Sequence, residues 1–148
     1  MKKYDDAEPL FREAIDMWTA LGVSESSELA NLNSNLGATL CGINRTTEGV
    51  EFARKGAEMH QKLSGAEHWT VGDARGIVGN CLSKSGDVTG AETEIQEAYR
   101  LIAAGLGSDH AKTKQVAAAL IDLFNQSGQP GKAEQFRATL ANGRQPTP

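Results

Sequence analysis

Residues 63–72 read LSGAEHWTVG, and residues 106–115 read LGSDHAKTKQ. Each stretch places a histidine directly after an acidic residue and three residues after a glycine, His68 in the first and His110 in the second. The two histidines are 42 residues apart. Small residues recur with the same spacing, at Ala7, Gly49, Ala91 and Ala133. A fixed period of this length is typical of repeat arrays, in which each unit packs on its neighbours.

Each repeat divides into an amphipathic A helix followed by an amphipathic B helix. Apolar residues at helical spacing predict B helices at about 3–21, 46–63, 88–106 and 130–141, and A helices at about 26–42, 68–85 and 110–127. The A helices are expected to end near Asn44, Gly86 and Gly128, because Asn and Gly tolerate the left-handed conformation that follows a helix. The small residues at 49, 91 and 133 are expected to let the A and B helices of a repeat approach closely.

The predicted fold class is therefore all-α, an α-α superhelix in the form of a right-handed solenoid of about seven helices. We expect one repeat domain over residues 1–141, with a half repeat at 3–21 and repeats at about 26–63, 68–106 and 110–141. Residues 142–148 read as a flexible polar tail. The first helix lacks the preceding neighbour that a repeat stack normally supplies.

Composition narrows the class of protein. The chain has 148 residues, of which 39% are hydrophobic and 23% charged, and its net charge is −4. These values favour a soluble protein and give no electrostatic reason to expect nucleic acid or a membrane as a partner. No apolar run approaches the ~18 residues of a membrane span, so a cytoplasmic location is expected.

Two cysteines, Cys41 and Cys81, make no disulfide framework, and we expect them to be reduced and inert.

No pattern of catalytic residues is present. The phosphate-binding loop, the nucleophile elbow and the zinc-protease helix motif are all missing, so we expect neither an enzyme nor a cofactor. His68 and His110 should lie about 10 Å apart as repeat equivalents, too far for one metal ion. We expect both to bind exposed backbone groups at the start of an A helix, and His60 to lie on the surface. A hydrolase or metal-binding protein that uses its His and Cys residues is the alternative with weaker support.

The stretch from Tyr4 to Ile15 resembles the second helix of a tetratricopeptide repeat, and so does the stretch from Gly128 to Phe136. The 42-residue period and the Leu-Gly-x-Asp-His connector at 106–110 are similar to the kinesin-light-chain subclass. Residues 79–140 resemble the repeats that follow the catalytic domain of bacterial serine/threonine protein kinases. Gly49 departs from the alanine usual in the family. The resemblance implies a non-catalytic module that binds proteins, as part of a larger bacterial signalling protein.

The resemblance also implies a peptide-binding groove lined by the A helices. The family's groove positions carry over to Asn31, Ser34, Asp73, Asn80, Lys84, Gln115, Asp122 and Asn125. Amide side chains suit an extended peptide because each offers both a donor and an acceptor. Lys84 is the one basic residue among these positions, which argues against a clamp for a terminal carboxylate. Two questions stay open: whether Trp69 anchors a partner or fills space between repeats, and whether the first helix mediates self-association into a homo-oligomer.

Overall fold

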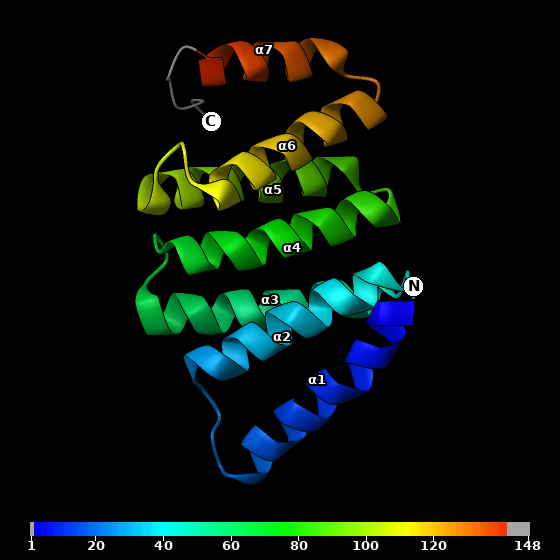
Figure 1. Ribbon diagram of the computed structural model, residues 1–148, viewed down its shortest axis with the longest axis vertical. Helices are drawn as coiled ribbons and strands as arrows, with labels where there is room; N and C mark the ends of the chain where they lie inside the picture. The colour runs from blue at the N-terminus through cyan, green and yellow to red at the C-terminus, as the bar shows by residue number, and fades with distance from the viewer. Residues whose placement is uncertain (1, 142–148) are drawn as a thin grey trace.

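The computed structural model describes residues 2–141, which form seven α-helices joined by short connectors (Figure 1). The helices are α1 (Lys2–Ala20), α2 (Ser27–Gly42), α3 (Thr46–Ser64), α4 (Trp69–Ser85), α5 (Val88–Leu106), α6 (Ala111–Gln126) and α7 (Pro130–Ala141). Every bound lies within one residue of the prediction, and all regular secondary structure in the described part of the chain is helical. The predicted tail at 142–148 lies outside the described residues.

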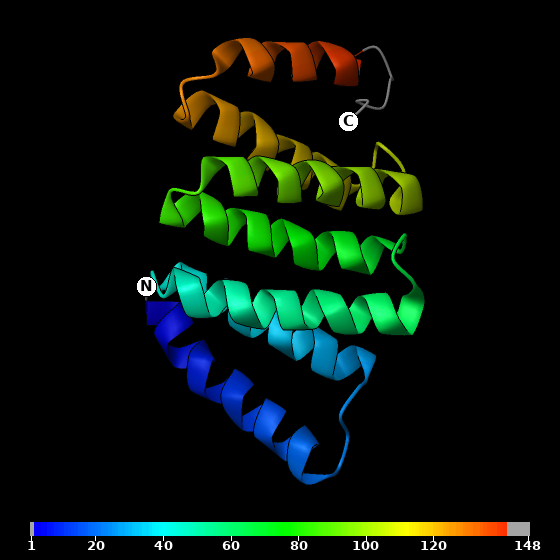
Figure 2. The same cartoon turned by 180° about the vertical axis from the view of Figure 1, so that it is seen from behind.

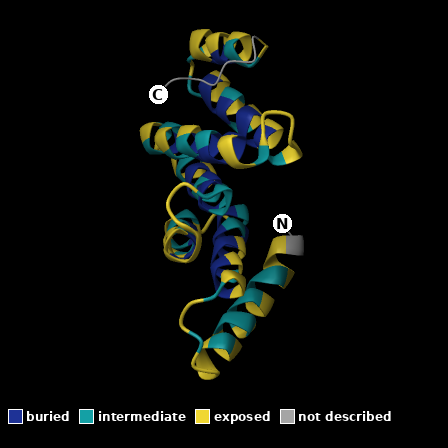
Figure 3. Cartoon of the chain, turned by 90° about the vertical axis from the view of Figure 1, so that its left-hand side faces the viewer, coloured by how far each residue is buried: buried dark blue, intermediate teal, exposed yellow. Residues whose placement is uncertain are grey.

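The helices stack one after another along the long axis of the molecule, with α1 at one end and α7 at the other (Figure 1). The A helices α2, α4 and α6 face the viewer in Figure 1, whereas α3 and α5 lie in front in the reverse view of Figure 2. Buried residues follow the lines where helices meet, and exposed residues cover the outer surfaces (Figure 3). Two clusters of buried hydrophobic residues lie within this packing, one between α5, α6 and α7 and one where α1, α2 and α3 meet.

His68 and His110 each cap the N-terminus of an A helix. The Nδ1 atom of His68 accepts a hydrogen bond from the backbone N–H of Thr70 at 3.3 Å, and that of His110 accepts one from Lys112 at 3.2 Å. Both histidines have extended backbone, as N-cap residues do. The predicted structural role of the two histidines is confirmed.

Residues with positive φ follow each A helix. Asn44 has a φ of 66°, Gly86 of 89° and Gly128 of 74°. These are the three residues that the sequence marks as helix ends, and each allows the left-handed turn that reverses the chain into a B helix. The helical hairpins of the fold are thus set by local sequence.

Small residues bring the helices of each pair close together. Gly49, Ala91 and Ala133 are all buried, as predicted. A Cβ atom added to Gly79 of α4 would lie 2.5 Å from the Ile95 side chain of α5. At such distances a larger side chain would force the helices apart.

The cysteine prediction is wrong. Cys41 and Cys81 form a disulfide that joins α2 to α4, with 5.4 Å between their Cα atoms. Their separation of 40 residues is close to the repeat period, so the two side chains lie opposite each other on neighbouring A helices. A protein disulfide is typical of oxidising compartments. The disulfide therefore does not favour a cytoplasmic location, which stays a prediction.

The prediction for His60 is also wrong, because this residue is buried, with 4% of its surface exposed. His60 follows Ala53 and Gly56 at helical spacing, and all three lie on the buried face of α3. If only apolar residues are counted, the predicted buried face of α3 ends before His60, and for this reason the sequence does not predict its burial. The burial of His60 depends on the neighbouring helices, since α3 packs against both α2 and α4.

The two ends of the stack are packed as the pattern suggests. Trp18 of α1 packs against the buried residues Leu29, Ala30 and Met59. Phe136 of α7 is buried and meets the ring of Tyr99 edge-on, with 5.3 Å between ring centroids. The terminal helices are therefore anchored through aromatic side chains, which bury a large apolar area each.

Candidate functional site

Three cavities lie around the middle of α4, between α2, α4 and α6, and together we call them the A-helix groove. The first cavity, of about 360 Å³, lies between the N-terminal halves of α2 and α4. The second, of about 410 Å³, lies between α2, α4 and α6 beside the disulfide. The third, of about 130 Å³, lies between α4 and α6. Ile77 lines all three, so the cavities meet at the middle of α4.

The second cavity combines an apolar floor with a polar rim. Its floor consists of Ile77, Ile95, Ala119, Leu123 and the Cys41–Cys81 disulfide. Its rim consists of Asn80, Ser83, Lys84, Asp122 and Gln126. Binding pockets commonly have this composition, in which apolar surface provides affinity and a few polar groups provide orientation.

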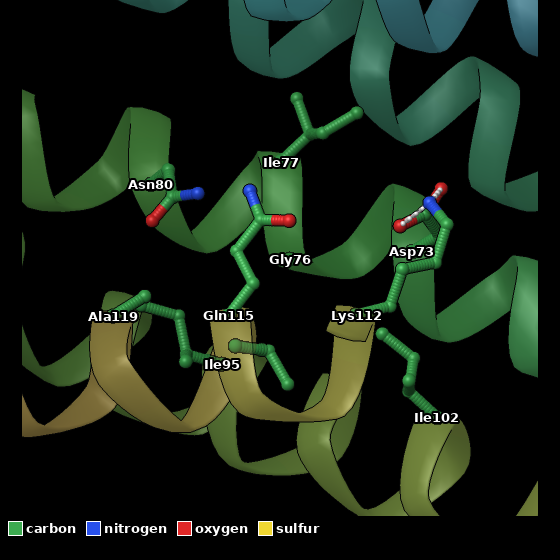
Figure 4. Close-up of a pocket in the computed structure, with 10 residues that line it drawn as sticks. Asp73, Gly76, Ile77, Asn80, Ile95, Ile102, Lys112, Gln115 and Ala119 are labelled. Atoms are coloured by element: carbon green, nitrogen blue, oxygen red, sulfur yellow. Dashed lines mark hydrogen bonds and ion pairs between the residues drawn. The ribbon is translucent and has the colours of Figure 1, made fainter. Parts of the chain in front are cut away.

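The structure brings most of the predicted groove residues together. Those that line one of the three cavities are Asn31, Ser34, Asp73, Asn80, Lys84, Gln115 and Asp122. Asn125 is exposed but lines none of these cavities. In Figure 4, Gln115 reaches from α6 toward Asn80 and Ile77 of α4. Side chains from successive repeats thus share one surface, and their role in binding stays a prediction.

Two predicted groove residues have structural contacts of their own. Ser34 is buried, and its Oγ would lie 2.2 Å from a Cβ atom at Gly56, so the hydroxyl faces α3. The Nζ atom of Lys84 donates a hydrogen bond to the Cys41 carbonyl at 3.0 Å. This carbonyl belongs to the last turn of α2, where a cation stabilises the helix dipole. Neither residue is a purely solvent-facing groove side chain.

Three residues contribute to the groove in addition to the predicted ones. Ile77 is half-buried and lines all three cavities. His60, which the sequence predicts at the surface, lines the first cavity. The Nζ atom of Lys112 lies 2.7 Å from each carboxylate oxygen of Asp73. Of the three, Lys112 has a signal in the sequence, because it lies 39 residues from Asp73, close to one repeat period.

Burial sets the protonation state of His60. The pKa of His60 lies below its ordinary value because burial disfavours the charged imidazolium. The nearby Asp73 carboxylate opposes this effect, and His68 adds to it. At neutral pH the first cavity therefore contains an uncharged imidazole that is able to accept a hydrogen bond.

The described residues offer no sign of metal chemistry or of a membrane anchor. Within residues 2–141, no three His, Cys, Asp or Glu side chains are grouped so as to hold a metal ion. In the same part of the chain, no helix combines the length and the apolar character that a membrane crossing requires.

Comparison with known proteins agrees with the repeat architecture. Residues 33–70 match the family model of the tetratricopeptide repeat. No curated protein matches the chain. The crystal structure of BtubC (BKLC) from P. vanneervenii superposes with a TM-score of 0.77 at 19% sequence identity, over 99% of this chain and 61% of that one. The chain thus spans less than two thirds of the length of this neighbour.

Tetratricopeptide repeats in general mediate protein–protein interaction, and they are typically non-enzymatic. Residues 33–70 thus match a tetratricopeptide repeat, and the chain shares its all-helical fold with BtubC (BKLC).

Proposed function

We propose that the chain binds an extended peptide segment of a partner protein in the A-helix groove. The observation that supports this proposal is the set of three cavities that share Ile77 and are lined by side chains from three successive A helices. An extended peptide suits neighbouring cavities, because its side chains enter them while its backbone meets amide groups on the rim. The resemblance to kinase-linked repeats favours a larger bacterial signalling protein as the context.

A peptide library tests this proposal. Immobilised protein selects binders from random twelve-residue peptides, and the affinity of the selected peptides is measured by calorimetry. The double variant Asn80→Ala/Gln115→Ala removes two amides from the groove and is expected to weaken binding at least about tenfold, since two hydrogen bonds are lost. Asn125→Ala is the matched control, because Asn125 is an exposed amide outside the three cavities. Equal affinity for the double variant and the wild type would place binding elsewhere.

Self-association through α1 is a second candidate, which the exposed apolar surface of this helix favours. Leu10, Met17 and Leu21 are 65%, 60% and 75% exposed. With Ala14 they follow one another at spacings of four, three and four residues, so they form a single stripe along the helix. A stripe of this kind is a common surface for pairing two helices.

Sedimentation velocity at several concentrations tests the second candidate. If α1 pairs with a second copy, the sedimentation coefficient of the wild type rises with concentration. Met17→Lys places a charge in the stripe and is expected to abolish the rise. Ala20→Lys adds the same charge to the exposed end of α1, a quarter turn away from the stripe, and is expected to leave the rise intact. A wild type that stays monomeric at all concentrations excludes this candidate.

A further inference from the structure

The A-helix groove contains a cation site that one of the protein's own lysines occupies. Lys112 extends from α6 to α4, where its Nζ atom contacts both carboxylate oxygens of Asp73 at 2.7 Å (Figure 4). The same Nζ atom lies 5.8 Å from the centroid of the Trp69 ring. A carboxylate beside the face of an aromatic ring is an arrangement that binds ammonium and guanidinium groups well.

Lys112 is held weakly in this position. The Lys112 and Asp73 side chains are 39% and 44% exposed. An ion pair this accessible to water contributes little to stability, because the solvent screens its charges. A cation brought by a ligand therefore displaces Lys112 at little cost in free energy.

Asp73 and Trp69 also line the first cavity, whereas Lys112 lines only the third. Among the described residues that line this cavity, Asp73 is the only Asp, Glu, Lys or Arg. Asn31, Asn35 and His60 add hydrogen-bond acceptors, because each amide has a carbonyl oxygen and the imidazole is neutral. The cavity thus presents one negative charge, the indole ring of Trp69 and several neutral acceptors.

We propose that the first cavity binds an arginine side chain of the partner peptide, whose guanidinium replaces Lys112 on Asp73 and Trp69. Arginine fits better than lysine for two reasons. Its planar fork of N–H groups matches the two oxygens of a carboxylate, and its flat face stacks on an aromatic ring. This inference rests on the proposed peptide-binding function and specifies one side chain of the ligand.

The proposal makes Lys112 a competitor of the ligand. Removing it by Lys112→Ala is expected to tighten binding of an arginine peptide by about two- to fivefold, the factor that a surface ion pair of up to ~1 kcal/mol allows. Asp73→Asn keeps the shape of the side chain but removes its charge, and is expected to weaken binding by about tenfold or more. A lysine with only a structural role would give the opposite sign for Lys112→Ala.

The probe is the peptide acetyl-Gly-Gly-Arg-Gly-Gly-amide, with the citrulline peptide as its uncharged counterpart. Nuclear magnetic resonance follows the indole N–H of Trp69 during titration, and the indole N–H of Trp18 in α1 is the internal control. We expect a saturable shift of the Trp69 signal with the arginine peptide, tighter in Lys112→Ala and lost in Asp73→Asn. Circular dichroism verifies that both variants are folded.

Three results would overturn the arginine site: no shift of the Trp69 signal in either wild type or Lys112→Ala, an equal shift with the citrulline peptide, or weaker binding by Lys112→Ala. The proposed function fails separately. Library peptides that depend on Asn80 and Gln115 but neither on an arginine nor on Asp73 would leave the groove in place and remove only the arginine site.

Discussion

At the scale of single residues, Gly49 links a departure from the repeat pattern to the disulfide. The repeat family usually has alanine at this position. Here a Cβ atom would lie 2.2 Å from Cys41 Sγ and 2.8 Å from the Gly37 carbonyl oxygen. The glycine therefore provides the space that the sulfur occupies, and the sequence shows the departure without its cause.

Gly49→Ala is expected to destabilise the protein by about 1–3 kcal/mol, because the sulfur is tied to α4 and cannot move aside freely. Urea denaturation followed by circular dichroism measures the change. Gly131→Ala is the matched control, since a Cβ atom at this position of α7 would meet nothing within 4 Å. Equal stability of Gly49→Ala and the wild type would show that the α2–α3 contact yields easily.

His60 predicts a loss of stability in mild acid. Its folded-state pKa lies below the ordinary value of 6.5, so the unfolded chain takes up this proton first as the pH falls. The resulting destabilisation is absent above the ordinary pKa, and it grows as the pH drops toward the folded pKa. The free energy of unfolding is expected to fall more between pH 7.5 and 5.5 in the wild type than in His60→Gln. Parallel pH profiles of the two proteins would count against a buried neutral histidine.

At the scale of helices, local sequence decides where each element begins and ends. Caps and turn residues act over three or four positions, so Ser26, His68 and His110 start the A helices and Asn44, Gly86 and Gly128 follow them. For this reason the predicted helix bounds are correct to within one residue. The repeat period supports the predicted helix bounds further, because each boundary recurs 42 residues later.

The capping role of His110 is testable by itself, because this exposed side chain bonds to its own helix terminus. His110→Ala is expected to lower the free energy of unfolding by about 0.5–2 kcal/mol, the usual value of an N-cap. His110→Ser is expected to restore most of the loss, since the serine hydroxyl accepts the same backbone N–H. The comparison is made by urea denaturation, and equal losses in the two variants would contradict a capping role.

At the scale of the whole molecule, the disulfide fixes the A helices of two successive repeats relative to each other. It closes a loop with a sequence separation of 40 residues, and it forms part of the floor of the second cavity. A stack in which each repeat contacts only its neighbours is otherwise free to flex between layers. The disulfide therefore stiffens the part of the groove between α2 and α4.

Reduction of the disulfide is expected to lower the free energy of unfolding by about 2–4 kcal/mol, as estimated for a loop of this length. Thermal unfolding with and without dithiothreitol measures the effect. Hydrogen exchange should rise in α2 and α4 more than in α6. The double variant Cys41→Ala/Cys81→Ala is the control, and dithiothreitol should not change its melting temperature. An unchanged melting temperature of the wild type under verified reduction would contradict this role.

The sequence by itself determined the period, the seven helices, their ends and the capping histidines, because these depend on residues a few positions apart or on exact repetition. It also identified most residues of the candidate groove, since their position on the A helices follows from the repeat. Only the tertiary structure decided the Cys41–Cys81 disulfide, the burial of His60 and the contact of Lys112 with Asp73 and Trp69. Each of these depends on the sideways distance and rotation between neighbouring helices. That geometry is the sum of many packing contacts, and no short stretch of the sequence encodes it.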